Sequence, residues 1–309
     1  MSRRTLLTAA GATGLAGATS FAGAAHAAPS AAAPKTDALI CAAVRSNLHV
    51  MSFNIRYDKP GTLPGQADYW PERIPALQAL LGLEIPTVLG VQEGLFHQLE
   101  AIEGALPKHY KSIGFGRDGG SQGEYSCIFY DSRRLTVLKW DQFWLSDTPE
   151  AIGSATWGNY VTRTVTWGTF KDNSTDREML LINTHFDHQS ENARVGSAHA
   201  IVDLVKGLAP ALPAILTGDF NSAATDSAAY STLTDRGLFR DTWSAAEVQL
   251  TPAYGTLPDY KDPVSGAPRI DWVLTSPDVR VLKAAINTFR LDGRYPSDHA
   301  PVQALIRLP

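Results

Sequence analysis

Short polar groups adjoin several apolar segments of this chain, and their residue types are those that can do chemistry. In order along the chain they are FNIR (53–56), VQE (91–93), NTH (183–185), GDFN (218–221), IDW (270–272) and SDHAP (297–301). Carboxylate, amide and imidazole groups can together hold a divalent cation, orient a water molecule and move protons. In open α/β sheets, polar residues gathered beyond the strand ends line the crevice that binds the ligand. The six groups therefore predict one site built from strand ends.

Three of these groups predict two specific side-chain arrangements. Asp219 and Asn221 are two residues apart, and on an extended segment both side chains would point the same way, toward one ligand. The alternative for this pair is an Asx turn that caps the next helix. Asp271 and His299 are expected to form a hydrogen-bonded pair, in which the carboxylate fixes the tautomer of the imidazole and raises its basicity.

The apolar segments that must position these groups have the patterns of strands separated by helices. Strands are predicted at 48–55, 87–92, 125–130, 136–145, 161–170, 179–184, 214–218, 270–275 and 301–308, and helices at 72–83, 95–106, 191–208 and 227–236. Some strands alternate apolar and polar residues, whereas others are continuously apolar and are expected to be buried on both faces. This mixture predicts an α/β fold with packed mixed sheets, in one domain at 47–309.

Residues 1–27 have the pattern of an export signal. A basic start at Arg3 and Arg4 precedes an uncharged stretch rich in Ala and Gly, and Ala25-His26-Ala27 fits a small-x-small cleavage site. The order Ser-Arg-Arg-Thr-Leu-Leu favours the twin-arginine type, with an ordinary secretory signal or an uncleaved anchor as alternatives. Residues 28–46 are expected to be a disordered mature N-terminus, and the mature protein is expected to be secreted.

Composition narrows the classes of function. The 309 residues include 27 Lys and Arg against 31 Asp and Glu, a formal charge of −4, and removal of Arg3 and Arg4 with the signal would bring it to −6. This balance argues against a broad basic surface for nucleic acid or anionic membrane. Cys41 and Cys127 are too few for a disulfide scaffold or a multi-cysteine zinc cluster, although one disulfide stays open. No later stretch has the ~20 apolar residues of a membrane span, so no stable membrane association is expected.

The ordered motifs resemble the endonuclease/exonuclease/phosphatase superfamily of metal-dependent phosphoesterases. The resemblance extends from Leu48 to Leu308 and rests on MSFNIR (51–56), VQEG (91–94), GEYSCIFY (123–130), INTHFDH (182–188), TGDFNS (217–222), RIDWVL (269–274) and SDHAPV (297–302). It implies a four-layer α/β sandwich of two packed mixed β-sheets flanked by helices, and the stretch at 142–158 is similar to a secreted bacterial branch. The implied activity is hydrolysis of a phosphodiester or phosphomonoester by in-line attack of water.

The resemblance also implies a divalent-cation site made of oxygen ligands. Glu93 is expected to be the principal carboxylate, with Asn54 adding its amide oxygen. Asp298 is expected to complete this site or to support a second ion. Such ligands suit Mg²⁺ or Mn²⁺, while Ca²⁺ or Zn²⁺ stays open.

Catalytic roles follow from the same resemblance. Asp219 is expected to activate or orient the attacking water, and Asn221 to contact the phosphate or the transition state. His299, supported by Asp271, is expected to face the phosphate as a base or as an electrostatic stabiliser. His185 is expected to donate to a phosphate oxygen or to protonate the leaving group, and Glu124 matches the family position that orients this second histidine.

Other residues have a structural alternative beside the functional one. Arg163 lies in the predicted strand at 161–170 and is expected to bind phosphate through its guanidinium, or else to pair with Glu124 or Asp187 as scaffold. His188 is expected to be a buried core histidine. Four aromatic residues are expected either to form a substrate platform or, more often, to pack in the core: Trp70, Trp157, Trp167 and Tyr254.

The expected substrate is a small-molecule, sugar or lipid phosphoester. The scattered basic residues and the negative charge favour it over an extracellular DNase- or RNase-type nuclease, which would present Lys and Arg loops along a nucleic-acid backbone. That nuclease stays as the alternative, so nucleic acid is retained as a partner. An inactive binding protein is the alternative from another class, and the complete set of motif residues argues against it. The protein is expected to be a monomer.

Overall fold

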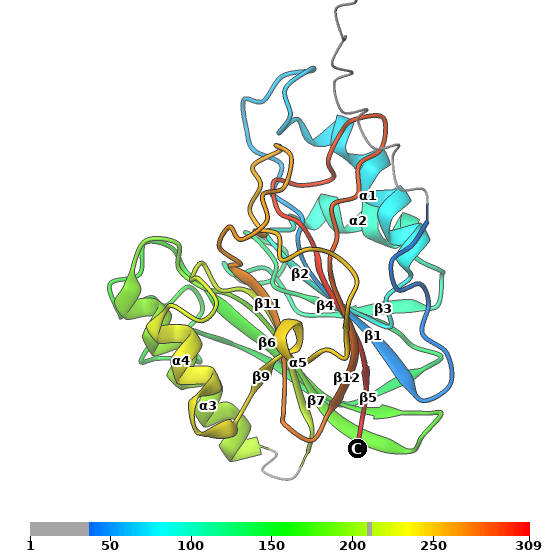
Figure 1. Ribbon diagram of the computed structural model, residues 1–309. Coiled ribbons are helices and arrows are strands. Elements are labelled where there is room, and N and C mark those ends of the chain that lie inside the picture. The colour runs from blue at the N-terminus through cyan, green and yellow to red at the C-terminus, as the bar shows by residue number, and fades with distance from the viewer. Residues whose placement is uncertain (1–36, 209–211) are drawn as a thin grey trace, which may run out of the picture. The chain divides into compact units, whose positions relative to one another are not determined.

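Two mixed β-sheets form the centre of the fold in a computed structural model that describes residues 37–208 and 212–309 (Figure 1). The seven-stranded sheet contains, in spatial order, β10 (Val248–Gln249), β12 (Arg280–Ile286), β13 (Val302–Arg307), β1 (Asn47–Asn54), β2 (Val88–Gln92), β4 (Ile128–Asp131) and β3 (Tyr110–Ile113). The six-stranded sheet contains β5 (Leu135–Trp144), β6 (Thr164–Asp172), β7 (Arg177–His185), β8 (Ala214–Asp219), β11 (Asp271–Thr275) and β9 (Arg240–Asp241).

Helices cover the outer faces of both sheets. Helices α1 (Trp70–Glu84) and α2 (Phe96–Ala105) share a buried apolar cluster with β1, β2 and β4. Helices α3 (Glu191–Leu208) and α4 (Ala228–Thr234), followed by a 3₁₀ turn at Asp235–Gly237, pack on the six-stranded sheet, and the short α5 (Thr242–Ala245) lies beside β11 and β12. Among the described residues, none of the helices is both long enough and apolar enough to cross a membrane.

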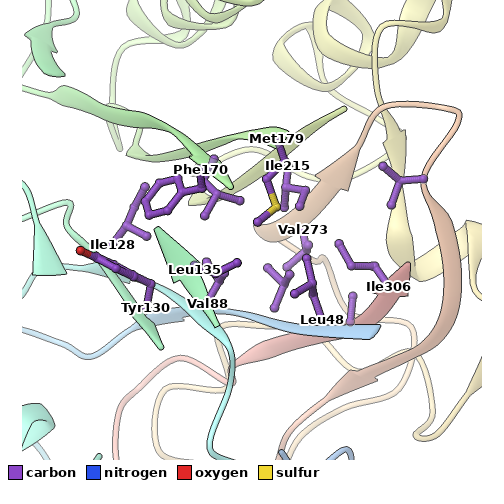
Figure 2. Close-up of a cluster of buried hydrophobic side chains, with 14 of the residues drawn as sticks. Leu48, Val88, Ile128, Tyr130, Leu135, Phe170, Met179, Ile215, Val273 and Ile306 are labelled. Carbon is purple, nitrogen blue, oxygen red and sulfur yellow. The ribbon is translucent and has the colours of Figure 1, made fainter. Parts of the chain in front are cut away.

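The core between the sheets joins the two halves of the domain (Figure 2). Leu48 and Val88 from the seven-stranded sheet pack with Met179, Ile215 and Val273 from the six-stranded sheet. These side chains are almost fully buried, with exposed fractions of 2 % or less. The helix–sheet–sheet–helix order confirms the predicted four-layer α/β sandwich.

The predicted elements are present, with their ends moved by a few residues, and four strands were not predicted. The four are β3, β9, β10 and β12, of which β9 and β10 have two residues each. The predicted strand at 161–170 begins only at Thr164, because the backbone N–H groups of Tyr160 and Val161 donate to the Asp187 carboxylate instead of a neighbouring strand. Arg163 is therefore the residue directly before β6 rather than part of the strand.

A polar joint holds the two sheets together beneath the strand ends. Asn183 in β7 accepts hydrogen bonds from Gln92 Nε2 (2.7 Å) and Thr217 Oγ1 (2.9 Å), and donates to the carbonyl oxygen of Val91 (2.8 Å). All four residues are nearly fully buried. Gly90 makes room for this joint, because a Cβ there would lie 2.6 Å from Asn183 Oδ1 and 2.1 Å from Thr217 Oγ1.

Residues 28–46 were predicted to be disordered. The structure describes residues 37–46 of this segment, and they are attached to the domain. The buried Glu84 carboxylate at the end of α1 accepts from the backbone N–H groups of Leu39 (2.8 Å), Ile40 (3.1 Å) and Cys41 (3.2 Å). The expectation of disorder is therefore wrong for 37–46. Its remaining residues and the predicted signal at 1–27 lie outside the described residues. Both cysteines are free thiols, Cys41 exposed and Cys127 buried.

Replacement of Gly90 by alanine is expected to lower the free energy of unfolding by about 1–3 kcal/mol, because the added methyl group would overpack the joint between the sheets. Urea unfolding monitored by tryptophan fluorescence measures the change. The control is Gly207→Ala in α3, where a Cβ would meet no atom within 4 Å, and where alanine should be neutral or stabilise by about 0.5–1 kcal/mol. Equal stabilities of the two variants would contradict this role of Gly90.

Candidate active site

The polar strand ends meet at one edge of the two packed sheets. Asn54, the last residue of β1, lies opposite Gln92 at the end of β2, directly before Glu93. His185 at the end of β7 lies opposite Asp219 at the end of β8, and Asp219 lies opposite Asp271 at the start of β11. Strand register within each sheet, together with the packing of the two sheets, therefore brings together groups that are far apart in the sequence, as the sequence pattern predicts.

Asn54 lies at the centre of this cluster and is fully buried. Its Nδ2 donates to Glu93 Oε1 (3.0 Å) and Asp219 Oδ2 (2.9 Å), and lies 3.4 Å from His299 Nε2. Its Oδ1 accepts from the backbone N–H of Arg56 (3.0 Å). The amide nitrogen of Asn54 therefore faces the carboxylates. The prediction had its amide oxygen as a metal ligand, and this oxygen accepts from the Arg56 backbone instead.

Three side chains at this edge could hold a metal ion together. Donor atoms of Glu93, Asp219 and His299 all lie within 4.8 Å of one another. The predicted set of Asn54, Glu93 and Asp298 shares only Glu93 with this group. Asp298 lies to one side, where it accepts from Ser297 Oγ (3.2 Å). The structure therefore places Asp219 and His299, predicted as catalytic residues, beside the principal predicted ligand.

The chemistry of these donors fits a divalent cation. Burial and then the neighbouring Asp271 carboxylate raise the pKa of Asp219 to about 7. Asp271 Oδ1 is buried and has no hydrogen-bond partner among the described residues. The negative charge is therefore incompletely balanced by side chains, and a cluster of carboxylate oxygens suits Mg²⁺ or Mn²⁺.

Asp271 and His299 form the predicted pair. His299 Nδ1 donates to Asp271 Oδ2 over 2.9 Å, and both side chains are buried. Burial lowers the pKa of His299, but the Asp271 and Asp219 carboxylates outweigh it and hold the pKa well above the ordinary value of histidine. With Nδ1 held by Asp271, the opposite ring nitrogen, Nε2, faces Asp219 Oδ2 at 3.8 Å.

His185 is oriented by Arg163 rather than directly by Glu124. Arg163 Nη1 donates to His185 Nδ1 (2.8 Å) and lies 3.5 Å from Glu124 Oε2, which also accepts from Arg117 (2.7 Å). The prediction that Glu124 orients His185 is thus corrected to an action through Arg163. The guanidinium is buried between these partners, so the scaffold alternative for Arg163 describes this structure better than the predicted phosphate contact does.

The same contact determines the protonation of His185. Burial and then the Arg163 charge hold the pKa of His185 well below its ordinary value, so the ring is neutral near pH 7. Because a guanidinium can only donate, the ring proton lies on Nε2. The Nε2–H group faces Asp219 Oδ2 at 3.3 Å. Asn221 Nδ2, which is also a donor, lies 3.0 Å from Nε2 and donates to the carbonyl oxygen of Phe186 (3.0 Å).

Asp219 and Asn221 are not on an extended segment. Asn221 has a φ of 47°, in the left-handed region, and its backbone N–H donates to Asp219 Oδ1 (2.9 Å). The predicted extended backbone is therefore wrong, although both side chains do point toward the same atom, His185 Nε2. An Asx turn is present, but it does not cap the next helix, because Ser227 caps α4. The turn still brings the Asn221 amide to His185, so both residues belong to the site.

The segment that follows His185 meets a second loop through an exposed aromatic pair. Tyr160 is 64 % exposed, and its ring meets His188 edge to face with the centroids 5.0 Å apart. The buried Asp187 carboxylate holds both loop segments through four backbone N–H groups, those of Tyr160, Val161, Gln189 and Ser190. His188 is exposed, which corrects its expected place in the core.

The four aromatic residues that were candidates for a platform are packed instead. Trp70 and Trp167 are buried core residues. Trp157 packs against α3, where a Cβ on Gly196 would lie 2.8 Å from its ring, and Tyr254 packs against a small cluster around α5 and β12. Packing, the alternative for these residues, accounts for their positions.

Two arginines that sequence reasoning missed organise the loops around the acids. Arg56 pairs with Asp68 and lies beside Glu93 and Asp298. Arg73 in α1 is fully buried, and its guanidinium donates to the carbonyl oxygens of Ile55, Arg56, Tyr57, Asp68 and Pro296. Arg56 could have been found as the charged end of the FNIR motif, whereas nothing in the helical pattern distinguishes Arg73 from a solvated residue.

Replacement of Arg163 by methionine is expected to raise the pKa of His185, because the guanidinium is the largest cause of its depression after burial. NMR titration of the His185 Cε1 proton in metal-free protein measures this pKa. The control is Arg290→Met, which removes a guanidinium paired with the exposed Asp262 and should leave the titration unchanged. An unaltered His185 pKa in Arg163→Met would refute the electrostatic role given to Arg163.

Comparison with known proteins is consistent with this geometry. The model of the endonuclease/exonuclease/phosphatase family matches residues 51–299. A structure of a family member from Bacteroides thetaiotaomicron is 32 % identical, with a TM-score of 0.79, covering 86 % of this chain and 100 % of that one. The mannosyl-6-phosphatase Bt3783 from the same organism is 33 % identical, with a TM-score of 0.77, covering 84 % of this chain and 99 % of that one.

More distant structures share the fold alone. TDP2 from Danio rerio, solved with single-stranded DNA product, is 17 % identical, with a TM-score of 0.64, covering 85 % of this chain and 99 % of that one. Among curated proteins, none matches the sequence. From the family model and the two similar Bacteroides structures, this chain belongs to the endonuclease/exonuclease/phosphatase family of metal-dependent phosphoesterases and is a phosphoric ester hydrolase.

Proposed function

We propose that this chain is an exported, Mg²⁺- or Mn²⁺-dependent phosphatase that hydrolyses the phosphomonoester of a sugar or a similar small molecule. The observation that carries the proposal is the pair of carboxylates of Glu93 and Asp219, which offer donor atoms within 4.8 Å of each other and of the charged His299, beside the neutral His185. A divalent cation held there would neutralise phosphate charge and stabilise the leaving oxygen.

The side chains around the cluster have complementary tasks in this proposal. Asp219 orients the attacking water, since its Oδ2 faces both histidines and its Oδ1 is fixed by the Asn221 N–H. His299, held by Asp271 at 2.9 Å, presents a positive charge to the phosphate as negative charge builds up in the transition state. His185 donates from Nε2 to a phosphate oxygen, and the Asn221 amide contacts a second one.

A small substrate is favoured over nucleic acid by the pairing of the nearby arginines. Arg56, Arg117 and Arg163 are each paired with a carboxylate within the protein, so these three are not free to follow a chain of phosphates. The 33 % identical neighbour is a mannosyl-6-phosphatase, which supports a sugar phosphate. We propose that the exposed ring of Tyr160, which packs on His188 three residues after His185, contacts the sugar.

Release of inorganic phosphate from mannose 6-phosphate by the purified enzyme is the expected activity, with plasmid DNA and RNA left intact. Treatment with EDTA should abolish the activity, and Mg²⁺ or Mn²⁺ should restore it. Asp219→Asn should lower kcat by about 10²–10⁴-fold, as for a positioned acid–base group. The matched control, Asp203→Asn, changes an exposed acid on α3 and should retain activity.

Two outcomes would overturn the proposed substrate or the proposed class. Cleavage of DNA or RNA without hydrolysis of sugar phosphates would identify a nuclease. Failure of the metal-loaded enzyme to hydrolyse any member of a panel of sugar phosphates, inositol phosphates, phospholipids and nucleic acids would support an inactive binding protein.

Export is the second part of the proposal and is supported by the sequence of residues 1–27. Replacement of Arg3 and Arg4 by lysine is expected to stop export of the folded enzyme in a bacterial host with a twin-arginine pathway, because the paired arginines are the feature that this pathway reads. Activity in the extracellular and cytoplasmic fractions, together with N-terminal sequencing of the exported protein, measures the result. The exported protein should begin at Ala28, and undiminished export of the double variant would contradict the twin-arginine assignment.

A further inference from the structure

One cation of the protein already lies against the acid cluster. Arg56 Nη1 is 3.7 Å from Glu93 Oε2, and Arg56 Nε is 3.6 Å from Asp298 Oδ2. The guanidinium therefore lies between the Glu93 and Asp298 carboxylates. It faces Oε2 of Glu93, whereas Asn54 contacts the other oxygen, Oε1. Glu93 is thus engaged on both oxygens, by the Asn54 amide on one and by positive charge on the other.

The position of Arg56 is held by several independent contacts. Asp68 accepts from both Nε (3.2 Å) and Nη2 (3.1 Å) of Arg56, and the Tyr260 hydroxyl donates to Asp68 Oδ1 (2.8 Å). The guanidinium also lies over the ring of Tyr57, 4.8 Å from its centroid. A side chain fixed at this many points loses little further freedom when it serves as a stationary charge.

The backbone on which Arg56 stands is fixed as well. Arg56 has a φ of 56°, in the left-handed region, and its N–H donates to Asn54 Oδ1 (3.0 Å). Its carbonyl oxygen accepts from Arg73 Nη2 (3.0 Å) and Gln98 Nε2 (3.1 Å). The direction in which the side chain leaves the chain is therefore determined by the fold.

We infer that Arg56 is a built-in cation at the Glu93–Asp298 edge of the cluster, and that the active site consequently takes one divalent cation rather than two. The inference rests on the proposed metal dependence of the enzyme and goes beyond it by stating the number of ions. Arg56 is a positioning residue in this account, because it acts through the two carboxylates.

The geometry explains why a second ion is excluded. In two-metal sites the ions lie about 3.5–4 Å apart and act as a pair on the attacking and leaving oxygens. Here the second position would need Glu93 Oε2 and Asp298, where the guanidinium lies. Glu93 Oε2 also accepts from the backbone N–H of Tyr57 (3.2 Å). The sequence left open whether Asp298 supports a second ion. In this account Asp298 instead pairs with Arg56.

Titration with Mn²⁺ tests the inference without an activity assay. Isothermal titration calorimetry of the metal-free wild type should give one bound ion, and its Mn²⁺ EPR spectrum at saturation should show no spin-coupled pair. Arg56→Met should bind a second ion and produce the spectrum of a coupled pair. Arg56→Lys, which keeps the charge, should remain at one ion. Arg280→Met, which removes an exposed guanidinium paired with Glu247, is the matched control and should also bind one.

Arg56→Gln provides a second variant should Arg56→Met fail to fold. Glutamine keeps a polar side chain beside Asp68 but removes the positive charge, so this variant should also bind a second Mn²⁺. Two ions in the wild type, or one ion in both Arg56→Met and Arg56→Gln, would overturn the inference and leave the proposed function standing. Absence of Mn²⁺ binding in the wild type would instead overturn the metal dependence on which the proposed function depends.

Discussion

Buried negative charge at the meeting point of two sheets is the constraint on which the rest of this structure depends. Strand register places Asp219 opposite Asp271. Glu93, which follows β2 of the other sheet, has a donor atom within 4.8 Å of one on Asp219, and Asp298 lies beside Arg56. Two like charges 4 Å apart repel by ~4 kcal/mol at an effective dielectric constant of 20, so such a cluster persists only if cations balance it or a carboxyl keeps its proton, as the pKa of about 7 for Asp219 indicates. The protein supplies His299 and Arg56, and a divalent cation would supply what they leave uncompensated.

The scaffold beneath the cluster keeps these charges from separating. The Asn183 joint ties the two sheets together where Gly90 allows them to approach, and Arg73 fixes the loop that carries Arg56 through buried backbone contacts. None of these groups is assigned a chemical step, but each holds in place a strand end or loop that carries a residue of the site. Function in this fold therefore depends on buried polar contacts that hold strand ends and loops in register, because a cation site tolerates little displacement of its ligands.

The sequence was sufficient for nine of the thirteen described strands and for the polar residues beside them, because an apolar run next to a polar group is a local pattern. Asp271 and His299 were expected to form a pair, and the structure contains their hydrogen bond. The direction of the Asn54 amide, the Asx turn at Asn221 and the insertion of Arg163 between Glu124 and His185 depend on contacts across the sheets. Such contacts produce no periodic pattern in the sequence. An arginine in a helix, such as Arg73, cannot be distinguished from a surface residue by sequence, because its partners are backbone carbonyl oxygens of loops.

The central claim is that the cluster at the strand ends holds one divalent cation that works on a phosphate ester. A crystal structure of the enzyme grown with Mn²⁺ and inorganic phosphate, with anomalous data collected at the manganese edge, tests it most directly. The account predicts a single anomalous peak in contact with Glu93, with phosphate within reach of His185 and His299 and with Arg56 still beside Asp298. A second peak at the Glu93–Asp298 edge, or no peak at the cluster in crystals saturated with Mn²⁺, would contradict it.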